Sequence, residues 1–263
     1  MQGFDAEQED APEALRPILL RQLLFAAVVG LAGFAVLTGL VGWHTWGITP
    51  RPFLYVDGDR RFWGSLYEPR LGRMIEKGAD VSVRGAHGET VLHMAARYGT
   101  GESVRLLIAA GLDIEAGTAE GFRPLHDAVR KGNIDAVAAL IEAGADVDAR
   151  NEFGEPPLFM TAIGSYGPAT LEGRKAALSA LLQAGADPNA QDNYGQTSLY
   201  GIAYGLVFPG REYPDRIDAA TALLAAGADP LIPSKSGDTA LDLARKREFD
   251  ALIALFEAHI ESE

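Results

Sequence analysis

The sequence predicts an all-α protein in which one membrane-spanning helix precedes a solenoid of short helix pairs. Glycines recur with a period of about 33 residues between positions 78 and 154, and apolar residues recur at helical spacing between them. Residues 23–43 contain no charged side chain, which sets them apart from the rest of the chain. Sequence periods of about 20 to 50 residues are typical of solenoids, whose units have no core of their own and must stack on one another.

The repeat is most regular in residues 88–149. Leu92 and His93 recur as Leu125 and His126, and each pair is followed by small and aliphatic residues at the spacing of a buried helix face. A glycine closes each expected second helix, as Gly111 does in the first copy. A left-handed residue is expected at this glycine, because glycine adopts positive φ without steric cost.

The units share a short motif near their start. Its five forms are TVLH, RPLH, PPLF, TSLY and TALD, which begin at Thr90, Arg123, Pro156, Thr197 and Thr239. Together with the glycine period, these segments resemble the ankyrin repeat, whose signature is T-P-L-H-x-A. The resemblance implies that each unit is a projecting turn followed by two antiparallel helices. It also implies binding of other proteins through the concave surface of turns and first helices.

Residues 85–263 are expected to hold five such units, which begin at Gly88, Gly121, Gly154, Gly195 and Gly237. Residues 59–84 are expected to form a degenerate N-terminal capping repeat. The third and fourth units are longer than the first two, so insertions are expected near 164–172 and 205–214, between the two helices of each unit. Tyr166, Phe208 and Tyr213 would then form an accessory binding surface. The alternative is that both insertions are tolerated surface loops without a function.

The front of the chain divides into an acidic tail at residues 1–22, the expected transmembrane helix at 23–43 and a linker at 44–58. At the helical rise, residues 23–43 would span about 30 Å, the thickness of a bilayer core. A cleaved signal peptide is the alternative, but the acidic leader and the length of the apolar run favour an uncleaved single-pass anchor. Arg21, close to the helix, favours a cytoplasmic N-terminus. The repeats would then be extracytoplasmic, or periplasmic in a bacterium.

Charge and motifs argue against several functions. A net charge of −13 repels nucleic acids and favours a neutral or basic protein partner, although acidity also serves solubility. The chain has no cysteine and no phosphate-binding loop, zinc-protease or nucleophile-elbow motif, so neither enzymatic activity nor a cofactor is expected.

Two sets of polar residues follow the repeat register. His93 and His126 could form a metal or acid–base pair, but their register favours hydrogen bonds from each ring to the neighbouring turn. The recurring acids are expected to be turn residues that bind backbone N–H groups. They are Asp80, Asp113, Asp146, Asp187 and Asp229.

Carried over position by position, the resemblance implies a partner-binding surface. Its tip residues are His87, Phe122, Phe153 and Tyr194, and its first-helix face carries Tyr98 and Tyr204 beside Arg97, Arg130, Lys131, Lys246 and Arg247. Aromatic residues at three successive tips suit binding hot spots. The alternative is that each aromatic ring packs on its neighbouring turn.

The expected function is therefore a membrane-anchored adaptor or scaffold that binds a partner protein through the concave surface. The alternative is an accessory or protective subunit of a membrane-proximal or periplasmic enzyme or transporter. Such a subunit would contact its enzyme or transporter through the paired insertions.

Overall fold

The computed structural model describes residues 68–162, 171–205 and 214–262. The chain divides into two units, residues 1–50 and 51–263, and every described residue belongs to the second unit. The expected acidic tail, hydrophobic helix, linker and first capping helix at 59–66 lie outside the described residues. Within the three described ranges, no helix is both long enough and apolar enough to cross a membrane.

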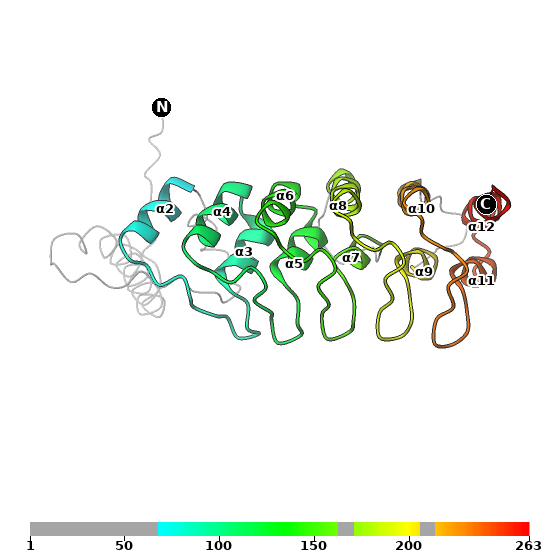
Figure 1. Cartoon of the computed structure of the whole chain (residues 1–263), viewed down its shortest axis with the longest axis horizontal. Helices are drawn as coiled ribbons and strands as arrows, with labels where there is room; N and C mark the ends of the chain where they lie inside the picture. Colours follow the sequence, from blue (N-terminus) through cyan, green and yellow to red (C-terminus); the bar gives the residue numbers. More distant parts are fainter. Residues whose placement is uncertain (1–67, 163–170, 206–213, 263) are drawn as a thin grey trace, which may run out of the picture. The chain divides into compact units, whose positions relative to one another are not determined.

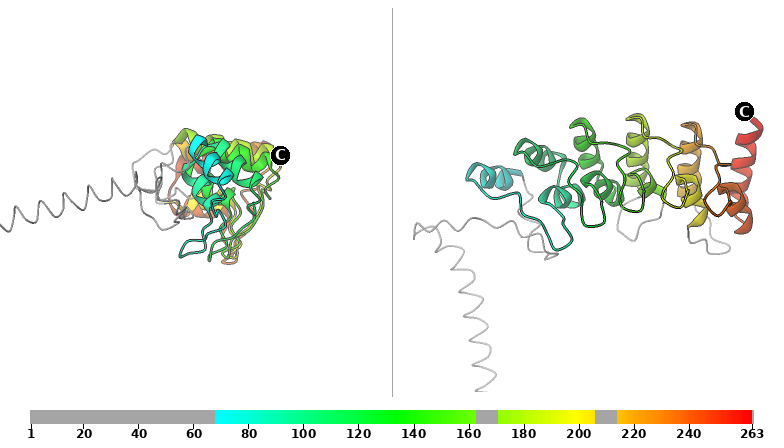
Figure 2. Two further views of the ribbon diagram at one scale, coloured as in Figure 1. Left: turned by 90° about the vertical axis from the view of Figure 1, so that its left-hand side faces the viewer. Right: turned by 60° about the horizontal axis from the view of Figure 1, so that its bottom comes forward.

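The described repeats form two rows of helices, with the turns projecting from one side (Figures 1 and 2). The first helices of successive units are α3 (Val91–Tyr98), α5 (Pro124–Lys131), α7 (Phe159–Ala162), α9 (Ser198–Tyr204) and α11 (Ala240–Lys246). The second row holds α2 (Glu68–Glu76), α4 (Gly101–Ala109), α6 (Ile134–Glu142), α8 (Leu171–Gln183), α10 (Pro214–Ala225) and α12 (Asp250–Ser262). Apart from one isolated β-bridge between Arg84 and Thr90, the regular elements of the described ranges are all helices. The expected all-helical solenoid is therefore confirmed in this part of the chain.

A single apolar core runs the length of the described repeats, from Leu71 in α2 to Phe256 in α12. Leu92 and Leu107 contribute one fully buried side chain each from the two helices of a unit, and later units repeat the arrangement. Buried alanines such as Ala95 and Ala128 let neighbouring first helices approach closely. Because this core is continuous across the units, the stack is stabilised as a whole.

Short local signals set the helix ends. Thr90, Thr197 and Thr239 are N-caps whose hydroxyl oxygens accept hydrogen bonds from the backbone N–H three residues later. The second helices from α2 to α10 end at left-handed glycines with φ between +76° and +92°, as expected. These are Gly78, Gly111, Gly144, Gly185 and Gly227. The unit without such a glycine continues its second helix, α12, to Ser262.

The two longer units differ slightly from the expectation. The breaks fall between the first and second helices, as expected, but α8 begins at Leu171 and α10 at Pro214. Residues 171–172 and 214, which the expected insertions included, are therefore helical. The two helices have 13 and 12 residues, whereas α4 and α6 have 9 each, so part of the added length extends the second helices.

Candidate functional site

The projecting turns form a ladder of backbone hydrogen bonds. In the first four turns, the backbone carbonyl of the residue before the tip glycine accepts a hydrogen bond from a backbone N–H of the next turn. That N–H belongs to the residue two positions before the next turn's own tip glycine. The bonds run from Ala119 N to His87 O (2.7 Å), Glu152 N to Glu120 O (3.0 Å), Asn193 N to Phe153 O (2.9 Å) and Lys235 N to Tyr194 O (2.8 Å). The turns are therefore joined directly to one another, as well as through the helices behind them.

The tip glycines meet two separate requirements. All of them have φ between +75° and +85°, the left-handed region that favours glycine. In addition, a Cβ atom on Gly195 would lie 2.9 Å from the backbone nitrogen of Lys235, and one on Gly154 would lie 2.8 Å from that of Asn193. At Gly237, in the last turn, a Cβ would meet no atom within 4 Å. At the inner tips, glycine is therefore favoured both by the left-handed backbone conformation and by the close approach of the next turn.

Side-chain hydrogen bonds hold the two most exposed aromatic tips in place. Oδ1 of Asn151 accepts hydrogen bonds from the backbone nitrogens of Phe153 and Glu155, both at 2.9 Å. Oδ1 of Asp192 accepts the equivalent bonds in the next turn, including one from Tyr194 at 2.8 Å. Both aromatic rings are consequently carried on an ordered backbone, which lowers the entropy lost on binding a partner.

The expected site residues differ in exposure. Tyr194 is 62% exposed, Tyr204 57%, Phe153 45% and Tyr98 37%, which are large values for aromatic side chains. His87 is also exposed.

Phe122 is different, because its ring is half-buried. It lies edge-on to His126 at 5.8 Å, 6.5 Å from the ring of Phe153, with the Arg130 guanidinium 5.5 Å from its centroid. Phe122 therefore packs against neighbouring side chains, whereas the rings of Phe153 and Tyr194 are exposed to solvent.

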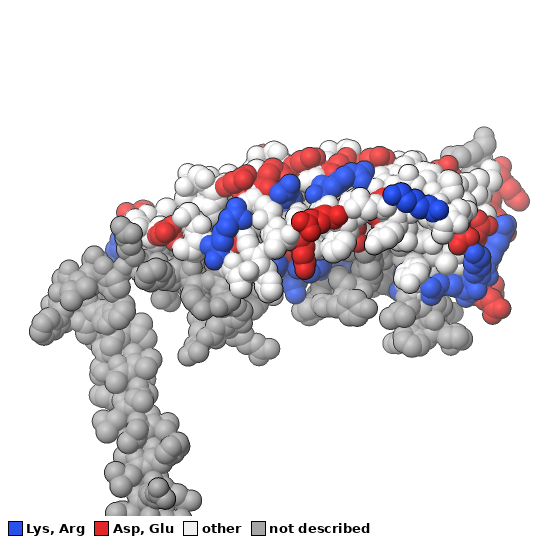
Figure 3. Space-filling view, turned by 90° about the horizontal axis from the view of Figure 1, so that it is seen from below, with Lys and Arg blue, Asp and Glu red and all other residues white. Residues whose placement is uncertain are grey.

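The first-helix face combines tyrosines with cations. Nζ of Lys131 lies 5.4 Å from the ring centroid of Tyr98, and Cζ of Arg247 lies 4.7 Å from that of Tyr204. In each pair the cation comes from the unit that follows the tyrosine. Figure 3, seen from the side of the turns, shows acidic side chains along the upper edge and a mixture of acidic and basic side chains across the middle.

A sequence model of ankyrin repeats, in three copies, matches residues 68–151. Residues 68–151 are therefore similar to ankyrin repeats. Ankyrin repeats indicate a protein–protein interaction module, and they are generally not catalytic. A search of curated proteins gives no match. Beyond residue 151, the described ankyrin-like units retain the same turn, glycine and helix-pair geometry as far as α12.

The repeat histidines join consecutive ankyrin units. Nδ1 of His93 accepts a hydrogen bond from the backbone nitrogen of Thr90 at 3.1 Å, so the ring proton is on Nε2, which donates to the carbonyl of Phe122 at 2.9 Å. His126 is bonded in the same way to Arg123 N (3.1 Å) and Glu155 O (3.0 Å). The expected hydrogen bonds to the neighbouring turn are confirmed, and both ring nitrogens are occupied. No group of three or more metal-ligating side chains occurs among the described residues.

Both histidine rings are fully buried. Burial lowers the pKa of His126 to about 4, and hydrogen bonding to the carbonyl of Glu155 only partly offsets this effect. Burial likewise lowers the pKa of His93. These histidines are therefore neutral near pH 7, and they stabilise the contact between ankyrin units as hydrogen-bonding groups.

The recurring acids are turn residues, as expected. Each accepts a hydrogen bond through Oδ1 from the backbone nitrogen two residues later, at 2.8 to 3.0 Å. In three turns, the side chain of the residue two positions after the acid accepts a hydrogen bond from the backbone N–H of the corresponding acid in the next unit. These bonds run from Asp146 N to Glu115, from Asp187 N to Asp148 and from Asp229 N to Asn189.

One buried charged residue beneath the candidate surface was not predicted from the sequence. Asp127 is fully buried in α5, where its carboxylate lies 2.9 Å from Nε of Arg97 and 2.7 Å from Nη2 of Arg130. Burial acts to lower the pKa of Arg97, but the carboxylate of Asp127 outweighs it and raises that pKa overall. The equivalent positions in the flanking units are Met94 and Met160. A charged residue at an otherwise apolar repeat position was the signal that could have identified this cluster.

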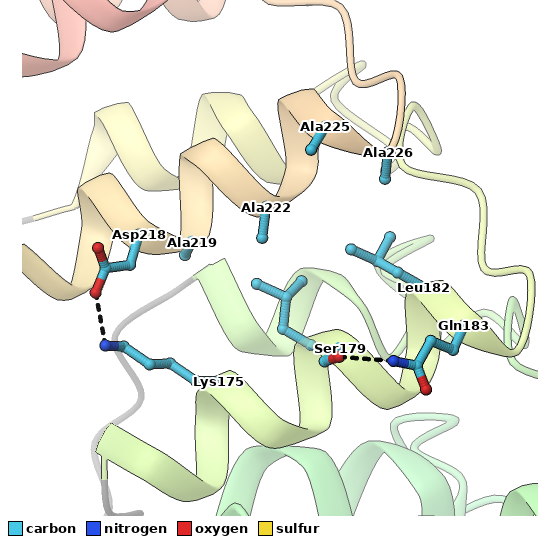
Figure 4. Close-up of a pocket in the computed structure, with 10 residues that line it drawn as sticks. Lys175, Ser179, Leu182, Gln183, Asp218, Ala219, Ala222, Ala225 and Ala226 are labelled. Atoms are coloured by element: carbon cyan, nitrogen blue, oxygen red, sulfur yellow. Dashed lines mark hydrogen bonds and ion pairs between the residues drawn. The ribbon is translucent and has the colours of Figure 1, made fainter.

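The expected insertion surface lies outside the described residues, since Tyr166, Phe208 and Tyr213 fall within 163–170 and 206–213. A groove of about 550 Å³ lies instead between α8 and α10 in the second row (Figure 4). Nζ of Lys175 pairs with Asp218 at 2.6 Å, and Gln183 donates to the Ser179 hydroxyl at 3.1 Å. These polar groups pair with each other, and alanines of α10 line the opposite wall.

Proposed function

We propose that this chain is an adaptor or scaffold that binds a partner protein through the surface formed by its turn tips and first helices. The observation that carries the proposal is the pair of exposed rings, Phe153 and Tyr194, held on consecutive turns by backbone and side-chain hydrogen bonds. Exposed aromatic residues on a rigid scaffold are favourable anchors, because they bury a large area at a low entropic cost.

We further propose that residues 23–43 anchor the protein in a membrane and that the repeats are extracytoplasmic. The support is the uncharged apolar run, which is long enough to cross a bilayer, together with Arg21 at its N-terminal side. A C-terminal reporter that is active on only one side of the membrane tests the orientation. Activity of a cytoplasmic reporter would place the repeats inside the cell.

The chemistry of the surface supports recognition without catalysis. The chain carries a net charge of −13, so the proposed partner is a protein of neutral or basic net charge, and nucleic acid is not a ligand. His87, Tyr98, Phe122 and Tyr204 extend the proposed contact around Phe153 and Tyr194. No cofactor takes part.

The test is recovery of a cross-linked partner from membranes that contain the full chain or its Phe153→Ala/Tyr194→Ala variant. Because both rings are exposed, the stack should remain folded while the cross-linked partner is lost. Leu231→Ala is a matched control, since Leu231 is 45% exposed but does not flank a tip glycine. Equal recovery by the double variant would contradict the proposal.

A further deletion separates the adaptor from the accessory-subunit alternative. Residues 163–170 and 206–213 are removed together, because they contain the insertion aromatics Tyr166, Phe208 and Tyr213. The adaptor proposal predicts that the partner is still recovered. Loss of the partner with this deletion, and not with the tip variant, would favour contact through the paired insertions.

A further inference from the structure

The two cation–tyrosine pairs lie at opposite ends of the first-helix face, each at the C-terminal end of its first helix. Lys131, at the end of α5, reaches back to Tyr98 at the end of α3. Arg247, directly after α11, reaches back to Tyr204 at the end of α9. Both distances are within the range of about 6 Å at which a cation and an aromatic face attract each other. A cation beside an exposed tyrosine therefore occurs twice, between units that are not adjacent.

The other cations on this face already have carboxylate partners. Arg97 and Arg130 pair with Asp127, and Lys246 pairs with Asp238 at 2.7 Å. Among the ion pairs between described residues, neither Lys131 nor Arg247 takes part. A ring contact leaves an ammonium or guanidinium with N–H donors that a carboxylate can accept.

Cations at helix C-termini also stabilise the helix dipole. That effect accounts for a positive charge in the last turn of α5, but it does not require a tyrosine beside the charge. Here both tyrosines keep 37% and 57% of their surface exposed next to the cation. The exposed ring and the cation together offer an apolar contact and a charge to the same incoming side chain.

We infer that the partner binds this face through an extended acidic segment, with carboxylates at two points that match the two cation–tyrosine pairs. The inference rests on the proposed binding function and specifies the chemistry of its ligand. From the α3–α5 contact to the α9–α11 contact there are three helix-to-helix steps of about 9 Å each. An extended chain advances about 3.3 Å per residue, so the two acidic points are about eight residues apart.

The net charge of the chain limits the rest of the partner. Its acidity repels an acidic protein as a whole, but screening confines this repulsion to about 10 Å at moderate ionic strength. A carboxylate in contact with Lys131 or Arg247 is therefore attracted by that cation more strongly than it is repelled by the distant acidic residues. The ligand is an acidic segment within a neutral or basic protein, with apolar residues between its acidic points to contact Phe153 and Tyr194.

The test is selection of a displayed library of random 16-residue peptides on the full chain in detergent micelles. Enriched peptides should carry Asp or Glu at two points about eight residues apart. The dissociation constant of an enriched peptide, measured by fluorescence anisotropy, should rise about tenfold for Lys131→Gln/Arg247→Gln. The variant Lys77→Gln/Arg105→Gln removes the same charge directly after α2 and from α4, outside the first-helix face, and should leave binding unchanged.

The outcomes separate this inference from the proposed function. Enrichment of neutral or basic peptides whose binding requires Phe153 and Tyr194 would overturn the acidic segment and leave the binding function intact. Equal loss of affinity in both charge variants would also overturn the inference, because it would reflect net charge alone. If the wild type enriches no peptide over the Phe153→Ala/Tyr194→Ala variant, the proposed binding surface itself is wrong.

Discussion

Substitution of the tip glycines separates backbone conformation from contact between turns. Gly195 and Gly237 have similar left-handed backbones, with φ of +75° and +85°. Alanine in that region costs about 1–2 kcal/mol at either position. At Gly195 the added Cβ would also lie 2.9 Å from the nitrogen of Lys235, so the next turn must move away. Loosening the 2.8 Å hydrogen bond from Lys235 to Tyr194 costs about 1 kcal/mol more.

Gly195→Ala should therefore lower the free energy of unfolding by about 2–3 kcal/mol, and Gly237→Ala by about 1–2 kcal/mol. The measurement is urea unfolding of the full chain in detergent, followed by circular dichroism, with midpoint and slope both compared because repeat arrays can lose all-or-none unfolding. Amide exchange at Lys235 should accelerate only in Gly195→Ala. Equal destabilisation of both variants, with unchanged exchange at Lys235, would refute the claim that the turns constrain one another.

Three further predictions concern the interior. Between pH 6.5 and about 4 the unfolded chain binds a proton at His126 that the folded chain does not. The contribution of His126 to the free energy of unfolding is therefore complete above pH 6.5 and falls by up to about 3 kcal/mol towards pH 4. Urea unfolding at several pH values should show this fall in the wild type and not in His126→Gln. Asp127→Asn removes the buried carboxylate that pairs with Arg97 and Arg130 and should cost about 3 kcal/mol by urea unfolding. An unchanged midpoint would show that these two ion pairs contribute nothing. Leu140→Ala, at a fully buried side chain of α6, should cost about 2–5 kcal/mol, and a loss below about 1 kcal/mol would mean that the neighbouring units close the cavity.

The candidate surface was only partly predictable from residue type. The tip aromatics were recognised by their register, yet Phe153 stands open while Phe122 is packed against His126 and Arg130. The two residues flank their tip glycines on opposite sides, because Phe122 follows Gly121 whereas Phe153 precedes Gly154. On its side of the glycine, Phe122 meets His126 and Arg130 of its own unit, and residue type alone did not predict that contact.

The sequence by itself determined the features that depend on local geometry. The regular glycine period, the glycine-ended helices and the turn acids follow from backbone preferences within a few residues, and each reappears in the described structure. The tertiary structure decided which side chains meet across units. The burial of Asp127, the cation–tyrosine pairs and the groove between α8 and α10 all depend on residues of successive units, or on the spacing of neighbouring helices. Such contacts depend on how one unit packs on the next. The position of a residue within its repeat predicts its backbone conformation, but the neighbouring unit supplies many of the side chains that it meets.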